Sequence, residues 1–156
     1  MATLIADPNL RTLVQVDTLL IMGLILMSNY TSVLRVTRSV YANPEDYIQK
    51  RLAVPEPSST SIVGGDSIAR SRRMHLNHLE NVLPFLVLSL LYALTEPAHA
   101  LFSGLLWSFL IARVIYTGFY ASRLQPHRTV AYAVGLVVES VIAILTLAAA
   151  LGLTGA

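Results

Sequence analysis

Residues 72–88, RRMHLNHLENVLPFLVL, decide how this chain folds, because charged and polar side chains continue without a break into an apolar segment. The segment has the length and composition of a membrane helix, so some of these charges enter the membrane. An ionisable group inside a bilayer costs roughly 2.5–3.5 kcal/mol on insertion scales. The stretch therefore indicates either a functional site or a buried ion pair.

The composition of the whole chain places it in a membrane. Of its 156 residues, 54% are hydrophobic and only 13% are charged, with a mean hydropathy of +0.62. A soluble domain averages about 25% charged residues. The hydrophobic composition predicts that the lipid bilayer surrounds the protein. The net charge of +2 gives no sign of nucleic-acid binding. The chain has no cysteine, so any thiol chemistry must use a thiol that a substrate brings.

Several apolar segments approach the ~20 residues that cross a bilayer. They run from Leu13 to Leu34, Met74 to Leu94, Ala100 to Ala121 and Val130 to Leu153. Residues 35–73 between the first two are expected to form a polar loop, whereas the later links are short. Short links predict antiparallel neighbours. The sequence thus predicts an all-α, up-down bundle of four transmembrane helices, forming one domain over residues 1–156.

Basic residues predict the orientation of these spans. Arginine and lysine gather in the first loop and in the link near Arg123 and Arg128, while the opposite side offers Arg11 alone. By the positive-inside rule, the first and third loops are cytoplasmic and both termini lie on the other side. The expected location is the endoplasmic reticulum or another internal membrane in a eukaryote, and the inner membrane in a bacterium.

Polar side chains recur at helical spacing in three of the spans. These stripes consist of Arg73, Asn77 and Glu80; of Arg113, Tyr116, Thr117 and Tyr120; and of Arg128, Tyr132 and Glu139. Glu80 and Arg113 lie roughly 9 and 12 Å below the same membrane edge, so a structural ion pair between them is expected. Polar residues in membrane helices can also simply bond their neighbours. Together, however, the groups suit a small, multiply charged ligand such as a zwitterionic peptide, with apolar surface nearby for a hydrophobic second substrate.

Other polar residues are interpreted as structural. The histidines at positions 75, 78, 99 and 127 lack the spacing of a ligand set, so no metal site is predicted. Asp17 lies about 26 Å from the cytoplasmic edge and is expected at the opposite interface. Glu139 is about 14 Å deep and has no predicted partner.

Ordered motifs resemble the MAPEG superfamily, the membrane-associated proteins in eicosanoid and glutathione metabolism. The resemblance is to the branch of microsomal glutathione transferases and prostaglandin E synthases. The motifs are ANPED at residues 42–46, R-x-H-x-N-x-x-E-x-x-x-P-F at 73–85, R-x-x-x-T-x-x-Y at 113–120 and Q-P-x-R at 125–128. Two positions depart: Tyr116 replaces the usual histidine, and Leu76 replaces an arginine of the prostaglandin synthase. Leu76 makes the chain more similar to the transferase.

The resemblance implies a homotrimer that binds glutathione between neighbouring subunits. The glutathione contacts that the resemblance implies are Arg35, Arg73, Asn77, Glu80, Tyr120 and Arg128. Arg113 and Tyr116 of the polar stripe are expected to join them. Arg128 is expected to stabilise the thiolate, and Thr129 or Tyr132 to donate a hydrogen bond to it.

The activity that the resemblance implies is a glutathione transferase or peroxidase acting on lipophilic electrophiles or lipid hydroperoxides. It implies roles in detoxification or eicosanoid metabolism. Two alternatives remain open from the sequence. One is a glutathione-dependent isomerase of the prostaglandin E synthase type, and the other is a non-catalytic member of the superfamily that binds lipid.

Overall fold

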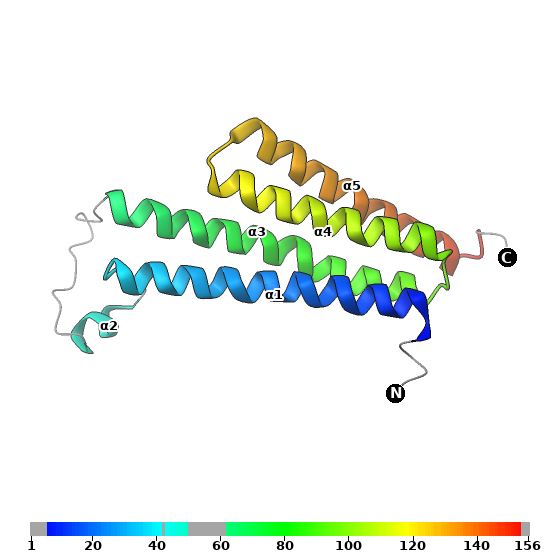
Figure 1. Cartoon of the computed structure of the whole chain (residues 1–156), viewed down its shortest axis with the longest axis horizontal. Helices are drawn as coiled ribbons and strands as arrows, with labels where there is room; N and C mark the ends of the chain where they lie inside the picture. Colours follow the sequence, from blue (N-terminus) through cyan, green and yellow to red (C-terminus); the bar gives the residue numbers. More distant parts are fainter. Residues whose placement is uncertain (1–5, 42, 50–61, 154–156) are drawn as a thin grey trace. The chain divides into compact units, whose positions relative to one another are not determined.

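The computed structural model describes residues 6–41, 43–49 and 62–153, which are helical with short links and contain no strand. Ala42 of the ANPED motif lies outside these described residues. The helices are α1 (Pro8–Thr37), α2 (Pro44–Gln49), α3 (Ile62–Ala93), α4 (His99–Ala121) and α5 (Gln125–Ala150) (Figure 1). All but α2 are long and apolar enough to cross a bilayer. The prediction of an all-α membrane protein with four transmembrane helices is confirmed.

The polar loop predicted for residues 35–73 is wrong over part of its length. Helix α2 occupies Pro44–Gln49, and α3 begins at Ile62, before the expected start of its span at Met74. Once a helix has formed, each further residue adds a hydrogen bond without a new nucleation cost. The membrane-embedded part of α3 can therefore continue into the polar sequence that precedes it.

The chain divides into two units, and each is described by itself. The first contains Met1–Met22 and His78–Ala156, and the second contains Gly23–Asn77. The core of the first unit is made of side chains that are less than 2% exposed, including Val16, Val82, Phe85, Phe102, Leu106, Phe109 and Ile142. The rings of Phe85 and Phe109 stack with their centroids 3.8 Å apart, which joins α3 to α4.

Tight links fix the helices of the first unit at their ends. Glu96 and Arg123 have φ values of 51° and 62°, so each reverses the chain in the left-handed conformation that commonly ends a helix. The Asn9 side-chain amide donates to the carbonyl of Pro97 at 2.8 Å and also bonds the His99 ring at 2.9 Å. The start of α1 therefore lies at the link between α3 and α4, as an up-down bundle requires.

Asp17, a residue expected at a membrane interface, has a side-chain partner on α3. It is half-buried within α1, nine residues after Pro8, and the Ser89 hydroxyl donates to its carboxylate oxygens at 3.1 and 3.3 Å. Position along a helix gives only a depth, and the facing residue on α3 depends on how the two helices are rotated. Asp17 is thus a partnered polar residue inside the first unit.

The second unit contains α2 together with the adjoining parts of α1 and α3. The Thr31 and Ser71 hydroxyls form a buried hydrogen bond of 2.7 Å, and Arg38 donates to the Ser67 hydroxyl. The Tyr41 backbone amide donates to the Tyr47 hydroxyl at 2.8 Å, and the two rings meet edge to face. These contacts hold α2 against the preceding loop.

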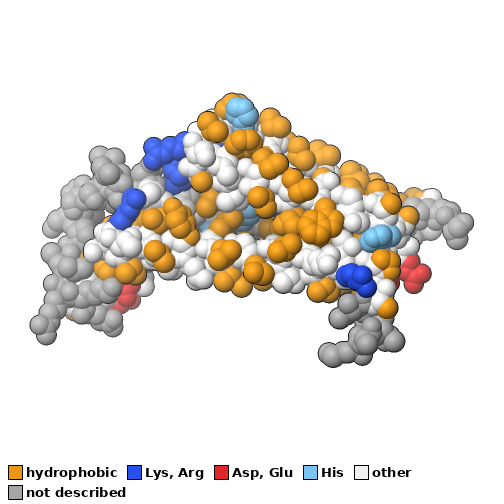
Figure 2. All heavy atoms as spheres, viewed as in Figure 1, with side chains coloured by type: hydrophobic (Ala, Val, Ile, Leu, Met, Phe, Trp, Pro, Cys, Tyr) orange, Lys and Arg blue, Asp and Glu red, His pale blue; other side chains and the backbone are white. Residues whose placement is uncertain are grey.

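Large apolar side chains remain exposed along all four spanning helices. Examples that are more than half exposed include Leu26, Val87, Val114, Val137 and Ile144. Hydrophobic side chains also cover much of the face seen in Figure 2. Such extended apolar surface would be unfavourable in water and matches the hydrocarbon core of a bilayer. The protein is an integral, multi-pass membrane protein.

Candidate functional site

Polar and aromatic residues gather between α4 and α5 in the first unit, and we call this group the α4–α5 cluster. Its members are Arg113, Tyr116, Tyr120, Arg128, Tyr132, Gly135 and Glu139. They recur every three or four residues on each helix, so each helix presents them on one face. The helices are antiparallel and joined by a short link, which brings these two faces into register.

The outer part of the cluster contains Arg128 and Tyr120. The guanidinium carbon of Arg128 lies 4.6 Å from the centroid of the Tyr120 ring, in the geometry of a cation–π contact. Tyr116 follows one turn deeper on α4, with its ring centroid 5.6 Å from that of Tyr120 and 6.3 Å from that of Tyr132. The rings thus form a continuous aromatic wall beside the Arg128 side chain.

Arg113 lies in the deeper part of the cluster and is only 2% exposed. Its guanidinium carbon is 5.1, 5.5 and 5.6 Å from the ring centroids of Phe109, Tyr116 and Tyr132. None of its guanidinium nitrogens has a hydrogen-bond partner among the described residues. A buried charge without hydrogen bonds is costly, and aromatic faces compensate only part of that cost. Arg113 therefore offers unused donors inside the protein.

The ion pair predicted between Glu80 and Arg113 is wrong. Glu80 is exposed on α3, and the Arg113 nitrogens bond no carboxylate of the described chain. The carboxylate that interacts electrostatically with Arg113 is Glu139 of α5, which had no predicted partner. Equal depth in the membrane did not bring Glu80 and Arg113 together, because depth does not specify the direction in which a side chain points.

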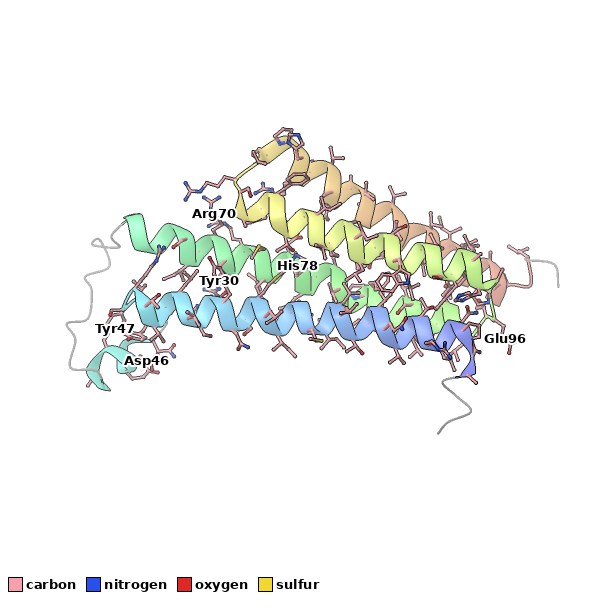
Figure 3. All side chains as sticks on the ribbon, viewed as in Figure 1. Tyr30, Asp46, Tyr47, Arg70, His78 and Glu96 are labelled. Atoms are coloured by element: carbon pink, nitrogen blue, oxygen red, sulfur yellow. The ribbon has the colours of Figure 1, made fainter. Side chains whose placement is uncertain are left out.

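His78 connects α3 to the cluster, a role that the sequence did not reveal. The Thr117 hydroxyl donates to the Arg113 carbonyl at 2.8 Å and lies 2.9 Å from Nε2 of His78. The hydroxyl hydrogen is used in the first bond, so Nε2 of His78 is the donor in the second. The imidazole also meets the Tyr116 ring edge to face, with centroids 5.5 Å apart. Figure 3 shows His78 on α3 on the side that faces α4.

The predicted site residues are divided between the two units. Arg113, Tyr116, Tyr120, Arg128 and Tyr132 come together in the cluster. Thr129 is exposed beside it and donates to the Gln125 carbonyl of its own helix at 3.4 Å. Glu80 also belongs to the first unit, whereas the second unit contains Arg35, Arg73 and Asn77. Arg35 and Asn77 are partly buried there, and Arg73 is exposed.

Other faces of α4 and α5 form an apolar crevice of about 550 Å³. Its walls include Ile111, Ile115, Phe119, Val130, Ala131 and Val134, and its few polar residues include Ser108 and His127. This volume is within the range of small-molecule pockets, which are mostly apolar with a few polar groups. One pair of helices therefore has a charged aromatic face and an apolar crevice.

Comparison with known proteins assigns the chain to a family. The MAPEG family profile matches residues 14–151. The chain belongs to the MAPEG family. Among its MAPEG relatives, microsomal glutathione S-transferase 1 of Homo sapiens is 38% identical over 121 residues, covering 76% of each chain. The mouse (Mus musculus) protein of that name is 35% identical over 119 residues, again covering 76% of each.

A second MAPEG relative has a different name. Prostaglandin E synthase of Homo sapiens is 28% identical over 128 residues, covering 81% of this chain and 80% of the synthase. The resemblance read from the sequence motifs is confirmed, including the branch. The higher identity to the transferases agrees with the interpretation of Leu76.

Proposed function

We propose that this MAPEG protein is a membrane-embedded glutathione transferase, also active as a peroxidase, that acts on lipophilic electrophiles and lipid hydroperoxides. The observation that carries the proposal is the pair of arginines in the α4–α5 cluster. Arg113 on α4 is buried and its guanidinium donors have no hydrogen-bond partner among the described residues. Arg128 on α5 belongs to the same cluster and lies over the Tyr120 ring. The names of the transferase relatives support the same activity.

The chemistry of the cluster fits glutathione. This tripeptide has two carboxylates, an amino group and a thiol. Guanidinium groups bind carboxylates with two parallel hydrogen bonds, a glutamate can hold an ammonium group, and phenols donate to anionic atoms. Arg113, Tyr116, Tyr120 and Arg128 supply such donors in the cluster, and Arg113 has no competing hydrogen-bond partner among the described residues. Glutathione, when bound, supplies the sulfur that bonds to an electrophilic carbon or reduces a peroxide.

Within this proposal, Arg128 stabilises the negative charge of the thiolate. A free thiol with a pKa near ~8.5 is only a few per cent ionised at neutral pH, and an adjacent fixed cation raises that fraction. Tyr132 or, in place of its bond to the Gln125 carbonyl, Thr129 donates a hydrogen bond to the same atom. Tyr120 supports the Arg128 guanidinium through its ring, so that the cation keeps one position as charge develops.

The family resemblance adds a second group of contacts and an assembly. We propose that Arg35, Arg73, Asn77 and Glu80 bind the glutathione peptide from a neighbouring subunit of a homotrimer. Native mass measurement in detergent tests the trimer. A stable monomer with full activity would remove this group of contacts from the proposal.

The apolar crevice on α4 and α5 is the proposed place for the hydrocarbon part of the second substrate. It is built into spanning helices, so a lipophilic molecule can enter it from the bilayer. We propose roles in detoxification and eicosanoid metabolism. The proposed location is the endoplasmic reticulum or another internal membrane if the organism is eukaryotic, and the inner membrane if it is bacterial.

A substrate panel tests the proposed activity. The purified protein in detergent is assayed with glutathione and 1-chloro-2,4-dinitrobenzene, a lipid hydroperoxide or a prostaglandin endoperoxide. Conjugation and peroxide reduction are expected. Turnover of the endoperoxide alone would instead favour the synthase-type isomerase, and inactivity on all three would favour a non-catalytic lipid-binding member.

A further inference from the structure

Gly135 occupies a place in the α4–α5 cluster that no other residue type could fill without a rearrangement. It is buried on α5, one turn beyond Tyr132 and one turn before Glu139. A Cβ added to Gly135 would overlap Nη2 of Arg113 and would lie 3.1 Å from both Cζ and Nε. The guanidinium therefore occupies the space in which a side chain at position 135 would begin.

We infer that Gly135 is a positioning residue: its missing side chain leaves a socket in α5 that seats the Arg113 guanidinium against the Tyr116 and Tyr132 rings. This inference rests on the proposed function, in which Tyr132 donates to the glutathione thiolate. Glycine is poorly suited to a helix interior, where it destabilises relative to alanine. The close approach of Arg113 is a specific reason for glycine at this position.

The seated guanidinium fixes the neighbouring rings. Arg113 touches Tyr116 and Tyr132 from one side through cation–π contacts, and the Thr117 hydroxyl ties the Arg113 backbone to His78. Tyr132 therefore lies between the Arg113 layer and the first turn of α5, which carries Arg128. A displaced guanidinium would leave the Tyr132 ring without its support on that side.

Two glycines of α4 lack this relationship. Gly104 and Gly118 of α4 are exposed, and an added Cβ at either position would meet no atom within 4 Å. They provide matched controls for the loss of a helical glycine. The overlap at Gly135 is with the end of a long side chain rather than with backbone, so Gly135→Ala is expected to move Arg113 and to preserve the fold.

The experiment measures thiolate formation in full-length protein in detergent, from ultraviolet absorbance on addition of glutathione across a pH series. Gly135→Ala is expected to lower the thiolate signal at neutral pH by about tenfold and to move its appearance to higher pH, because Tyr132 loses its position. Gly118→Ala is expected to leave both unchanged. A thermal unfolding scan of each variant reports whether the fold is retained.

Double variants distinguish the effect of the positive charge at position 113 from the effect of the side-chain size at that position. Lysine has a slimmer head than arginine and keeps the charge, so Arg113→Lys with Gly135→Ala should recover part of the thiolate signal. Arg113→Met with Gly135→Ala relieves the same overlap but removes the charge, and it should not recover the signal. Should Gly135→Ala fail to fold, the two double variants still carry the comparison.

The possible failures are distinguishable. Absence of a thiolate signal in the unmodified protein would overturn the proposed function itself. A normal thiolate signal in Gly135→Ala, or equal recovery by the lysine and methionine double variants, would overturn the role of Gly135 and leave the proposed function standing.

Discussion

Two buried polar groups of the first unit, the α4–α5 cluster and the Asp17–Ser89 pair, differ in how their hydrogen bonds are satisfied. Ser89 is 0% exposed, and its hydroxyl lies within bonding distance of both Asp17 carboxylate oxygens and of the Leu86 carbonyl. Arg113 is buried to a similar degree, yet its guanidinium nitrogens have no hydrogen-bond partner among the described residues, and aromatic rings lie close to them.

Within the proposed function, the difference separates a structural group from a group that binds glutathione. A buried polar group stabilises the fold only when its bonds are made within the protein, and an unsatisfied group costs free energy. The Asp17–Ser89 pair links α1 to α3 and has no donors to spare. Arg113 keeps donors that a bound carboxylate could use. Changes in the pair should therefore affect stability, and changes in the cluster should affect function.

The largest expected effect comes from Arg128→Leu. Loss of the guanidinium removes the charge that stabilises the thiolate, and the loss of one such group costs about 10²–10³ in kcat. The thiolate absorbance and the rate of conjugation of 1-chloro-2,4-dinitrobenzene check this, while the unfolding temperature should change little.

Arg123→Gln is the matched control, because Arg123 is an exposed arginine in the neighbouring link. It should keep both the thiolate signal and the rate. If the Arg128→Leu protein still forms the thiolate, the α4–α5 cluster does not have the functional role that distinguishes it from the Asp17–Ser89 pair.

The next effect is expected from Ser89→Ala and concerns stability. The variant removes the donor to Asp17 and leaves a half-buried carboxylate without that bond, at a cost of about 1–3 kcal/mol. The unfolding temperature in detergent should fall, and kcat/KM should stay the same for the fraction that remains folded. Ser140→Ala is the control, since Ser140 is exposed and its hydroxyl bonds the Leu136 carbonyl of its own helix. A loss of activity without a loss of stability would place Ser89 in the site.

The smallest expected effect comes from Val134→Trp, which narrows the apolar crevice. The KM for a lipophilic substrate should rise by about tenfold, the usual size of a steric change in a hydrophobic pocket, while thiolate formation stays normal. Val137→Trp places the same ring on an exposed part of α5 that does not line the crevice. Equal KM values in the two variants would show that the crevice does not hold the substrate.

Much of the cluster could be predicted from helical spacing. The positions of Arg113, Tyr116 and Tyr120 on α4, and of Arg128 and Tyr132 on α5, follow from a period of three to four residues and a short antiparallel link. The Glu80–Arg113 pair failed because the prediction used depth alone. The role of His78 was missed because it lies one residue from the predicted stripe on α3, and Gly135 was missed because glycine has no side chain to mark a site.

The sequence by itself determined that this protein has four membrane-spanning helices and belongs to the MAPEG family, because hydropathy, span length and ordered motifs are local properties of the chain. Only the tertiary structure decided which buried polar groups have hydrogen-bond partners. In the folded chain, Asp17 is hydrogen-bonded to Ser89 and Glu80 is exposed. Arg113 lies against Gly135 and has no hydrogen-bond partner among the described residues. The physical reason is that the partner of a buried side chain depends on the rotation and close approach of neighbouring helices, which no single helix specifies.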